Sequence, residues 1–334
     1  MKDRPEGVTE RELARALAEG WGIEPVTMQY APVGAGSYHW IVDDARGHRW
    51  FVNVDDLDDK SWLGDSRITR LGGLRETLKM AHVLRVQAGL GFVAAPLLAR
   101  DGAAAEPFHP RYAVSVYPFI AGVSGQFDGG FPDRARVQVI DLLAALHQVK
   151  PPGPVPVADP RLSRRDILET ALQELETPWS GGPFSEPARA LLATVAGPVG
   201  DLLVTFDRLA GPVAAAPHQV ITHGEPHPGN LIRTGDRTLL IDWDTAGRAV
   251  PERDLWSVLS DHGAGAQAAR YTAATGHRID PDALWFYRIR WTLDDLAAFT
   301  HQLRADHGDT EDAQEAWQAL KELAADATGQ AAAR

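Results

Sequence analysis

The first 120 residues alternate between two periods of hydrophobic and polar positions. Apolar residues fall at helical spacing in residues 8–20, where Thr9 is a candidate N-cap, and again from Arg75 to Gln87. Elsewhere apolar and polar residues alternate with the period of two that is typical of strands. The strand-like runs are Thr27 to Val33, Tyr38 to Val42, Trp50 to Val54, Phe92 to Leu98 and Tyr112 to Phe119. The pattern predicts a helix, three strands, a helix and two strands.

Helical periodicity dominates the rest of the chain. Pro118 and the segment IAGVSG interrupt the strand pattern, and a helix is expected from Pro132 to Lys150. A proline-rich connector follows at 151–160. Further helices are expected at 162–176, 185–209, 251–261, 264–275, 281–304 and 309–325. The chain therefore predicts an α+β fold with a boundary near residue 120.

Composition narrows the classes of protein that this chain can represent. The absence of cysteine excludes disulfides, thiol nucleophiles and cysteine-ligated metals. We expect a cytoplasmic protein with no membrane segment, since no run approaches about 18 unbroken apolar residues and the start, MKDRPEGVTE, lacks a signal-peptide core. The net charge of −12 lies mostly after residue 120, which disfavours nucleic acid as a partner and favours a cationic ligand.

The segment from Gln219 to Asp244 carries the strongest chemical signal. A strand-like run ends at Thr222, and the two prolines and two glycines of HGEPHPGN then predict a rigid loop. Two short strands follow, joined across a predicted tight turn, Thr234-Gly235-Asp236-Arg237. This hairpin brings Asn230 beside Asp242. An amide oxygen next to a carboxylate suits Mg²⁺ better than softer metals.

Phosphoryl transfer requires a carboxylate that orients the attacking hydroxyl, together with groups that hold Mg²⁺ against the nucleotide phosphates. Glu225, Asn230 and Asp242 can supply these groups. The sequence here resembles the aminoglycoside phosphotransferase and choline kinase superfamily, whose loop reads H-G-D-x-H-x-x-N before an I-D-W/F-D/E strand. The chain has HGEPHPGN and IDWD at these places. AVPERDLW, LLAALH and the pair Asp294-Asp295 are similar to the spectinomycin phosphotransferase branch.

The resemblance implies a two-lobed, protein-kinase-like fold. Residues 1–120 would form a nucleotide-binding lobe with a five-stranded antiparallel sheet plus helices, and residues 121–334 a larger, mainly helical catalytic and substrate-binding lobe. The implied reaction moves the γ-phosphoryl group of ATP or GTP, with Mg²⁺, to a hydroxyl of an aminoglycoside-like, aminocyclitol-like or other antibiotic acceptor. The implied site residues are Glu225 as the catalytic carboxylate, Asn230 and Asp242 as Mg²⁺ ligands, Gly34, Gly36, Ser37, Asn53, Glu76 and Tyr117 at the nucleotide, His223 and His227 as loop supports, and Asp294 and Asp295 at the cationic acceptor.

Two positions depart from the pattern of the family. Glu225 stands where the family has aspartate, and it is one methylene longer. Asn53 stands on the third strand where a lysine that pairs with the phosphates is expected, although the expected partner acid, Glu76, is present. Arg49, which shares a strand face with Asn53, and Lys60, in the next loop, are two candidates to replace the lysine.

Three alternatives compete with an antibiotic kinase. A metabolic kinase for choline-like, sugar or amino-alcohol substrates shares the same machinery, and a catalytically impaired relative would only bind a ligand or partner. A zinc hydrolase would use His223, Glu225 and His227, but prolines at 226 and 228 prevent the common helical face that H-E-x-x-H sites need. The acidic run at Asp55, Asp56, Asp58 and Asp59 is typical of a solvated turn without chemistry.

Overall fold

The computed structural model describes residues 1–334 except 35, 127–129, 151–152, 236, 260–264 and 334. Its chain divides into two compact units. The first unit contains Met1, residues 3–159 and residues 218–279, and the second contains Lys2, residues 160–217 and residues 280–334. The first unit joins segments from both sides of residue 120, so the predicted division into lobes at 1–120 and 121–334 stays a prediction.

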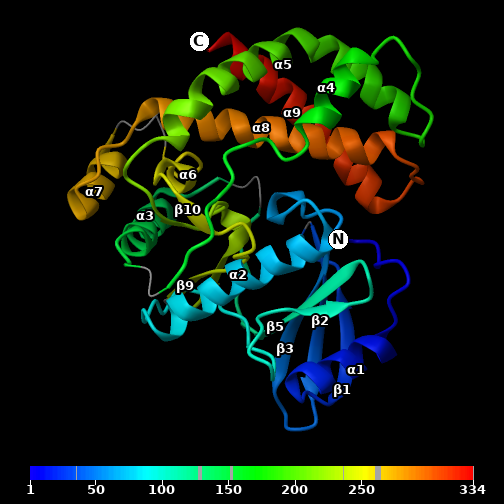
Figure 1. The fold of residues 1–334 in the computed structure, drawn as a ribbon, viewed down its shortest axis with the longest axis vertical. Coiled ribbons are helices and arrows are strands. Elements are labelled where there is room, and N and C mark those ends of the chain that lie inside the picture. The colour runs from blue at the N-terminus through cyan, green and yellow to red at the C-terminus, as the bar shows by residue number, and fades with distance from the viewer. Residues whose placement is uncertain (35, 127–129, 151–152, 236, 260–264, 334) are drawn as a thin grey trace. The chain divides into compact units, whose positions relative to one another are not determined.

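The first unit contains the expected five-stranded antiparallel sheet (Figure 1). Its strands, in the spatial order β1-β2-β3-β5-β4, are β1 (Pro25–Ala31), β2 (Ser37–Asp44), β3 (Arg49–Asp56), β4 (Glu106–Phe108) and β5 (Tyr112–Pro118). One predicted strand is wrong: Phe92 to Leu98 is irregular, and the short β4 takes its place. Pro96 lies within that run, and a proline cannot donate to a ladder of backbone hydrogen bonds.

Alternation along the strands gives this sheet one apolar and one polar face. Helix α1 (Glu10–Trp21) covers the apolar face, and Thr9 caps its start as predicted. The buried core there includes Leu13, Leu17, Trp40, Val42, Val52, Val54, Val114 and Val116. Ser37, Asn53 and Asp55 occupy the intervening positions of β2 and β3, so they share the opposite face.

Helix α2 (Arg67–Val86) begins about two turns before the predicted helix. Ser66 caps its start by accepting a hydrogen bond from the backbone of Thr69, a capping signal that the sequence analysis did not use. Gly73 packs against the 3-10 turn η1 (Ser61–Leu63), where an added Cβ would lie 2.5 Å from the carbonyl oxygen of Leu63. This close approach brings η1 against α2.

Short strands carry the predicted catalytic segment. Strand β7 (Val220–Thr222) pairs with β10 (Gly247–Ala249), and β8 (Leu231–Thr234) pairs with β9 (Arg237–Leu240) as the predicted hairpin; β6 (Val123–Ser124) adds to β8. The 3-10 turn η2 (Pro228–Asn230) ends the loop before β8. Within the predicted features, Asp236 of the hairpin turn, Ala35 of the glycine loop and residues 151–152 of the connector lie outside the described residues.

Three helices complete the first unit. They are α3 (Asp133–His147), α6 (Glu252–Leu255) and α7 (Ala266–Thr275). Helix α3 packs against α7 and β7. Helix α6 is shorter than the predicted helix at 251–261, of which residues 260–261 are not described.

The second unit consists of helices at the positions that the periodicity predicts. They are α4 (Arg165–Gln173), α5 (Ser185–Ala214), α8 (Pro281–Arg304) and α9 (Glu311–Ala332), with α5, α8 and α9 packed against one another. Helix α5 is long and apolar enough to cross a membrane by length and composition alone, and 33% of its most apolar 18-residue window is buried. Core helices of water-soluble proteins also pass this test of length and composition.

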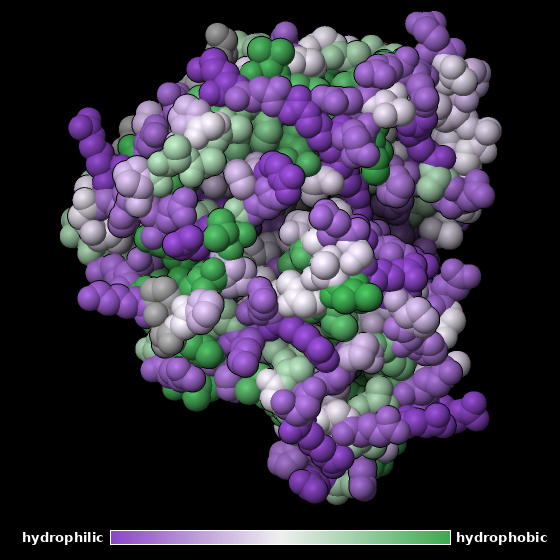
Figure 2. All heavy atoms as spheres, in the orientation of Figure 1, coloured by the Kyte–Doolittle hydropathy of each residue, from purple (hydrophilic) through white to green (hydrophobic). Residues whose placement is uncertain are grey.

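Hydrophilic side chains cover most of the face shown in Figure 2, with apolar side chains in separate spots between them. Apolar atoms make up more than half of an ordinary folded surface, so scattered spots of this kind need no partner to explain them.

Candidate active site

Main-chain hydrogen bonds fix the loop that follows β7. The carboxylate of Asp254 accepts from the backbone amides of His223 at 2.8 Å and Gly224 at 2.6 Å. Gly224 has φ of +104°, and a Cβ there would lie 2.5 Å from the guanidinium of Arg253, so only glycine fits. Arg253 in turn donates to the hydroxyl of Thr222 and the carbonyl of Thr245. Helix α6 therefore holds the start of the loop through two adjacent charged side chains.

Asp254 is itself braced by a buried histidine. His147 contacts Asp254 at 3.0 Å through Nε2 and the hydroxyl of Tyr271 at 2.7 Å through Nδ1. Burial alone raises the pKa of Asp254, but the hydrogen bond from His147 and the neighbouring positive charges outweigh it and hold the pKa below its usual value. Sequence reasoning missed Asp254 and His147, although both lie in segments that carried the resemblance, AVPERDLW and LLAALH.

His223 fastens the loop to the segment that leads into Asp242, the predicted Mg²⁺ ligand. Its Nε2 donates to the carbonyl of Ile241 at 2.8 Å, its Nδ1 accepts from the amide of Glu225 at 3.2 Å, and its ring packs edge-on against Trp243. Burial lowers the pKa of His223 to about 4, which keeps the ring neutral near pH 7. Both ring nitrogens are engaged, which removes His223 as a zinc ligand.

Asn230 lies at the open end of the hairpin, beside the strand that leads into Asp242. The amide of Ile241 donates to the carbonyl of Asn230 at 3.0 Å, which continues the register Leu231 to Leu240. The side-chain amide of Asn230 donates to the carbonyl of Glu225 at 3.0 Å and approaches Nε2 of His227 at 3.2 Å. Because its nitrogen binds the loop, its side-chain oxygen is the atom that would bind Mg²⁺.

Asp242 has the backbone conformation and the surroundings of a strained functional residue. Its φ is +64°, a left-handed conformation that non-glycine residues seldom adopt. Its side chain reaches solvent, yet crowding by protein atoms and the carboxylates of Asp244, Glu225 and Asp55 raise its pKa well above the usual value. Several carboxylates that repel one another favour a bound divalent cation, so the residues present fit Mg²⁺.

Glu225, the predicted catalytic carboxylate, lies on the same loop. Its side chain is 33% exposed, and its carboxylate lies 4.0 Å from Nε2 of His227. Burial, and to a smaller extent the charge of His223, lowers the pKa of His227 to about 4. The neutral His227 ring therefore accepts from the Asn230 amide, which ties together the two halves of the loop.

The polar face of the sheet carries the predicted nucleotide residues. Gly34 and Gly36 of the turn before β2 both have positive φ, of +68° and +82°. Ser37 donates to Asp55 at 2.6 Å. Asn53 contacts Nδ1 of His39 at 3.0 Å, so its side chain has a neutral partner. The Tyr117 side chain, near the same face, has its pKa raised by burial and by the nearby Asp55, Asp242 and Asp244 carboxylates.

The structure separates the two candidates for the missing lysine. The Lys60 side chain is 3% exposed, and its ammonium lies 2.5 Å from Asp244 and 3.1 Å from Asp55. Arg49 is 54% exposed and donates twice to Asp43, at 2.7 and 3.0 Å. Lys60 therefore joins the polar face of the sheet to the segment that contains Asp244, whereas Arg49 belongs to an exposed pair at the strand's start.

One expectation for the neighbouring acids is wrong, and another stays a prediction. Glu76, the expected partner of a lysine on β3, is exposed on α2, and among the described residues no ion pair with Lys60 is seen, so its role at the nucleotide stays a prediction. Conversely, Asp55 and Asp56 are 3% and 1% exposed, so they are not part of a solvated turn. Strand β3 extends through Asp56, and the alternation that places Asn53 on the polar face places Asp55 there as well.

Asp294 and Asp295, the predicted acceptor residues, lie on α8 in the second unit. The carboxylate of Asp294 accepts from the backbone amide of Ser163 at 3.0 Å and pairs with Arg290 at 3.3 Å. Burial raises its pKa, although Arg290 and Ser163 act in the opposite direction. Asp294 therefore already fastens the segment before α4, and its role at an acceptor stays a prediction, as does that of Asp295.

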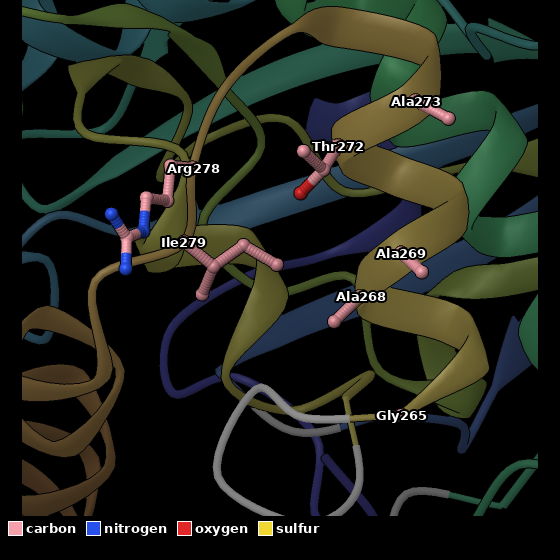
Figure 3. A pocket seen from close by; sticks show the side chains of 7 residues that line it. All are labelled: Gly265, Ala268, Ala269, Thr272, Ala273, Arg278 and Ile279. Carbon is pink, nitrogen blue, oxygen red and sulfur yellow. The ribbon is translucent and has the colours of Figure 1, made fainter.

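A separate hollow of about 500 Å³ lies against α7 (Figure 3). Gly265, Ala268, Ala269, Thr272, Ala273, Arg278 and Ile279 line it. The side chain of Arg278 extends away from Thr272 in this view. None of the predicted site residues contributes to this hollow, and its mainly small apolar lining supplies no carboxylate for phosphoryl transfer.

Comparisons with known proteins show the family of the chain. The family model described as "Phosphotransferase enzyme family" matches residues 31–287. Protein StrN of Streptomyces griseus is 28% identical over 244 residues, which are 69% of this chain and 71% of the relative.

Two solved structures share the fold. Spectinomycin phosphotransferase APH(9)-Ia, in complex with ADP and spectinomycin, superposes with a TM-score of 0.73 at 17% identity over 97% of this chain and 99% of that chain. Plasmodium vivax ethanolamine kinase superposes with a TM-score of 0.58 at 12% identity over 96% of this chain and 95% of that chain. At these identities the likeness shows the protein-kinase-like fold alone.

Proposed function

The chain belongs to the phosphotransferase enzyme family, and we propose that it moves the γ-phosphoryl group of ATP or GTP to a hydroxyl of an aminoglycoside-like, aminocyclitol-like or other antibiotic acceptor. The observation that carries this proposal is the joint placement of Glu225, Asn230 and Asp242. One loop and one hairpin present a partly exposed carboxylate, an amide oxygen and a second carboxylate together. Phosphoryl transfer needs these groups and little other covalent chemistry from the protein.

In the proposed reaction Glu225 orients the acceptor hydroxyl and takes its proton as the hydroxyl oxygen bonds to the γ-phosphorus; the bond from that phosphorus to the β–γ bridging oxygen breaks, and the nucleoside diphosphate leaves. Asn230 and Asp242 would hold Mg²⁺, which supplies positive charge to the phosphate oxygens. Neutral His227 keeps the Asn230 amide turned toward the loop, and Asp254 keeps the loop backbone in place. We place the reaction in the cytoplasm, where nucleoside triphosphates are abundant.

The acceptor class is supported by the likeness in fold to spectinomycin phosphotransferase and by the acidic character of the chain, whose net charge of −12 attracts cations. A metabolic kinase for amino alcohols is the second candidate, since an ethanolamine kinase shares the fold. Both candidates use the same donor site, so the acceptor alone distinguishes them.

The first test is a thermal-shift titration with ATP and with GTP, each with and without Mg²⁺. A rise in melting temperature that depends on Mg²⁺ is expected for at least one nucleotide, because ligands that bind only the folded state stabilise it. Acceptors are then screened by the mass gain of one phosphoryl group, with spectinomycin-like aminocyclitols and amino alcohols as separate panels. Absence of a shift with either nucleotide would favour a ligand-binding relative without catalysis.

A further inference from the structure

We propose that Lys60 contacts the nucleotide phosphates in place of the lysine that strand β3 lacks, and that Asp55 positions it. This inference rests on the proposed function, because it assigns a residue to the same donor site. The lysine has moved along the chain, from a strand to the loop before η1, while its charged group stays at the polar face of the sheet.

The contacts of Lys60 place its ammonium at the junction of three segments. Its Nζ lies 3.1 Å from Asp55 on β3, 2.5 Å from Asp244 and 3.4 Å from the hydroxyl of Ser37, the first residue of β2 after the glycine turn. Asp244 is two residues beyond Asp242, the predicted metal ligand. The ammonium therefore lies between the glycine turn and the Mg²⁺ segment, where triphosphate oxygens bind in the proposed reaction.

The charge balance keeps this lysine protonated. Burial alone lowers the pKa of Lys60, but the carboxylates of Asp244, Asp55 and Asp242 raise it well above the ordinary value. An ammonium has three N–H donors, and Asp55, Asp244 and Ser37 account for all three. The contact with Ser37 is the longest, so a phosphate oxygen displaces it at the lowest energetic cost.

Packing alone is a poor explanation for a lysine in this position. Removing two charges from water is energetically costly, and proteins in which apolar side chains replace a buried ion pair are often as stable or more stable. A fold that needed only a filled space here would be served by an apolar side chain. A buried ammonium paired with Asp55 and Asp244 next to the glycine turn is better explained as a group that also meets an anion.

Asp55 takes the part that was expected of Glu76. It lies two residues after Asn53, on the same face of β3, and it holds both Lys60 and Ser37. Glu76 is exposed on α2. Asp55 is therefore a positioning residue: it fixes the lysine and the end of the glycine turn without touching the nucleotide itself.

Lys60→Ala tests the proposal through nucleotide binding, measured by calorimetry with Mg²⁺. Loss of a charge-assisted contact is expected to weaken binding of the triphosphate by about 10- to 100-fold, while binding of the bare nucleoside, which has no phosphate, is unchanged. Lys79→Ala removes an exposed lysine of α2 and serves as the matched control. Arg49→Ala tests the rival cation, and both are expected to bind the triphosphate as the wild type does.

A second variant tests the relocation directly. Asn53→Lys added to Lys60→Ala returns a lysine to the strand and is expected to restore most of the lost triphosphate affinity. If affinity stays at the level of Lys60→Ala, the two positions are not interchangeable and the proposal is wrong. The proposal is also overturned if Lys60→Ala weakens the binding of nucleoside and triphosphate equally, or if it weakens the binding of neither. Lys60 then has only a structural role.

A test on the wild-type chain remains possible if the Lys60 variants do not fold. Hydrogen exchange of the wild-type chain, read by peptide mass spectrometry, is expected to slow at residues 57–63 when Mg²⁺-triphosphate binds, and to stay unchanged there with the bare nucleoside. Equal protection by both ligands, or by neither, contradicts the proposal. Failure of the wild type to bind either nucleotide overturns the proposed function as well, whereas normal binding by Lys60→Ala overturns this inference alone.

Discussion

The candidate catalytic loop and the proposed phosphate side of the site hold their chemical groups by different means. The loop is fixed through its backbone, because Asp254 accepts from the amides of two successive residues and His223 ties the loop to the carbonyl of Ile241. Glu225 and Asn230 then follow at set distances along the chain. In such a loop, Glu225 and Asn230 stay correctly placed only if the number of residues between them and His223 is unchanged.

The phosphate side is fixed from side chain to side chain. Ser37, Asp55, Lys60 and Asp244 come from four separate places in the sequence and meet through contacts of 2.5 to 3.4 Å. A charged group held in this way can be supplied from another segment, because only the position of its end group matters. This difference fits a loop that keeps the spacing of the family motif, with Glu225 in place of aspartate, and a proposed phosphate lysine that lies on another segment.

The largest effect is expected at the catalytic loop, from Glu225→Gln. The glutamine amide cannot take the proton of the substrate hydroxyl, so kcat is expected to fall by about 10³-fold with little change in nucleotide binding. Glu225→Asp, which keeps a carboxylate, is the control and is expected to retain activity. Steady-state transfer to the acceptor measures both, and a Gln variant with wild-type kcat would remove Glu225 from the mechanism.

At acidic pH, protonation of His223 is expected to lower the free energy of unfolding. The pKa of His223 is lowered by burial to about 4 in the folded chain, against about 6.5 when unfolded. The unfolded chain therefore binds this proton first as pH falls. Stability is full above about pH 6.5 and declines toward pH 4, by roughly 3 kcal/mol for this group.

Denaturation midpoints between pH 7 and pH 4 measure this effect. His223→Gln is expected to flatten the pH dependence relative to the wild type, because the titrating group is gone. His48→Gln, at a histidine whose side chain is 60% exposed, is the control and should leave the slope unchanged. Equal slopes for wild type and His223→Gln would show that the loop does not depend on a neutral imidazole.

A smaller effect is expected on the phosphate side, where Asp55→Asn and Glu76→Gln form a matched pair. Asp55→Asn removes the charge that positions Lys60 and is expected to weaken Mg²⁺-nucleotide binding by about tenfold. Glu76→Gln alters an exposed side chain and is expected to have no effect. Calorimetry compares the two, and the opposite ranking would restore Glu76 as the partner of the phosphate lysine.

The smallest effect is expected from Ser37→Ala. It removes one hydrogen bond of 2.6 Å to Asp55, and the net contribution of such a bond corresponds to a loss of about threefold to tenfold in nucleotide affinity. A thermal-shift titration with Mg²⁺-nucleotide resolves this difference. A loss as large as that of Asp55→Asn would show that Ser37 itself binds the phosphates.

Much of the fold could be predicted from periodicity and capping. Thr9 begins α1 as expected, and the helices of the second unit lie close to their predicted ranges. The misses have local causes: Pro96 prevents the strand predicted at 92–98, and Ser66 starts α2 earlier than its apolar spacing indicated. The side chains that brace the loop, Asp254 and His147, gave no periodic signal because each is defined by a partner distant in sequence.

By itself, the sequence determined the catalytic segment: a rigid loop with Glu225 and Asn230, then a hairpin that returns Asp242 beside them. These groups lie within 18 residues of one another, so turn and strand geometry suffice to bring them together. Only the tertiary structure showed that Lys60, and not Arg49, is buried against the polar face of the sheet. Only the tertiary structure showed that Glu76 is exposed and that Asp55 is buried. The pairing of Lys60 with Asp244 joins positions 184 residues apart, and such a contact depends on how whole elements pack rather than on any local pattern.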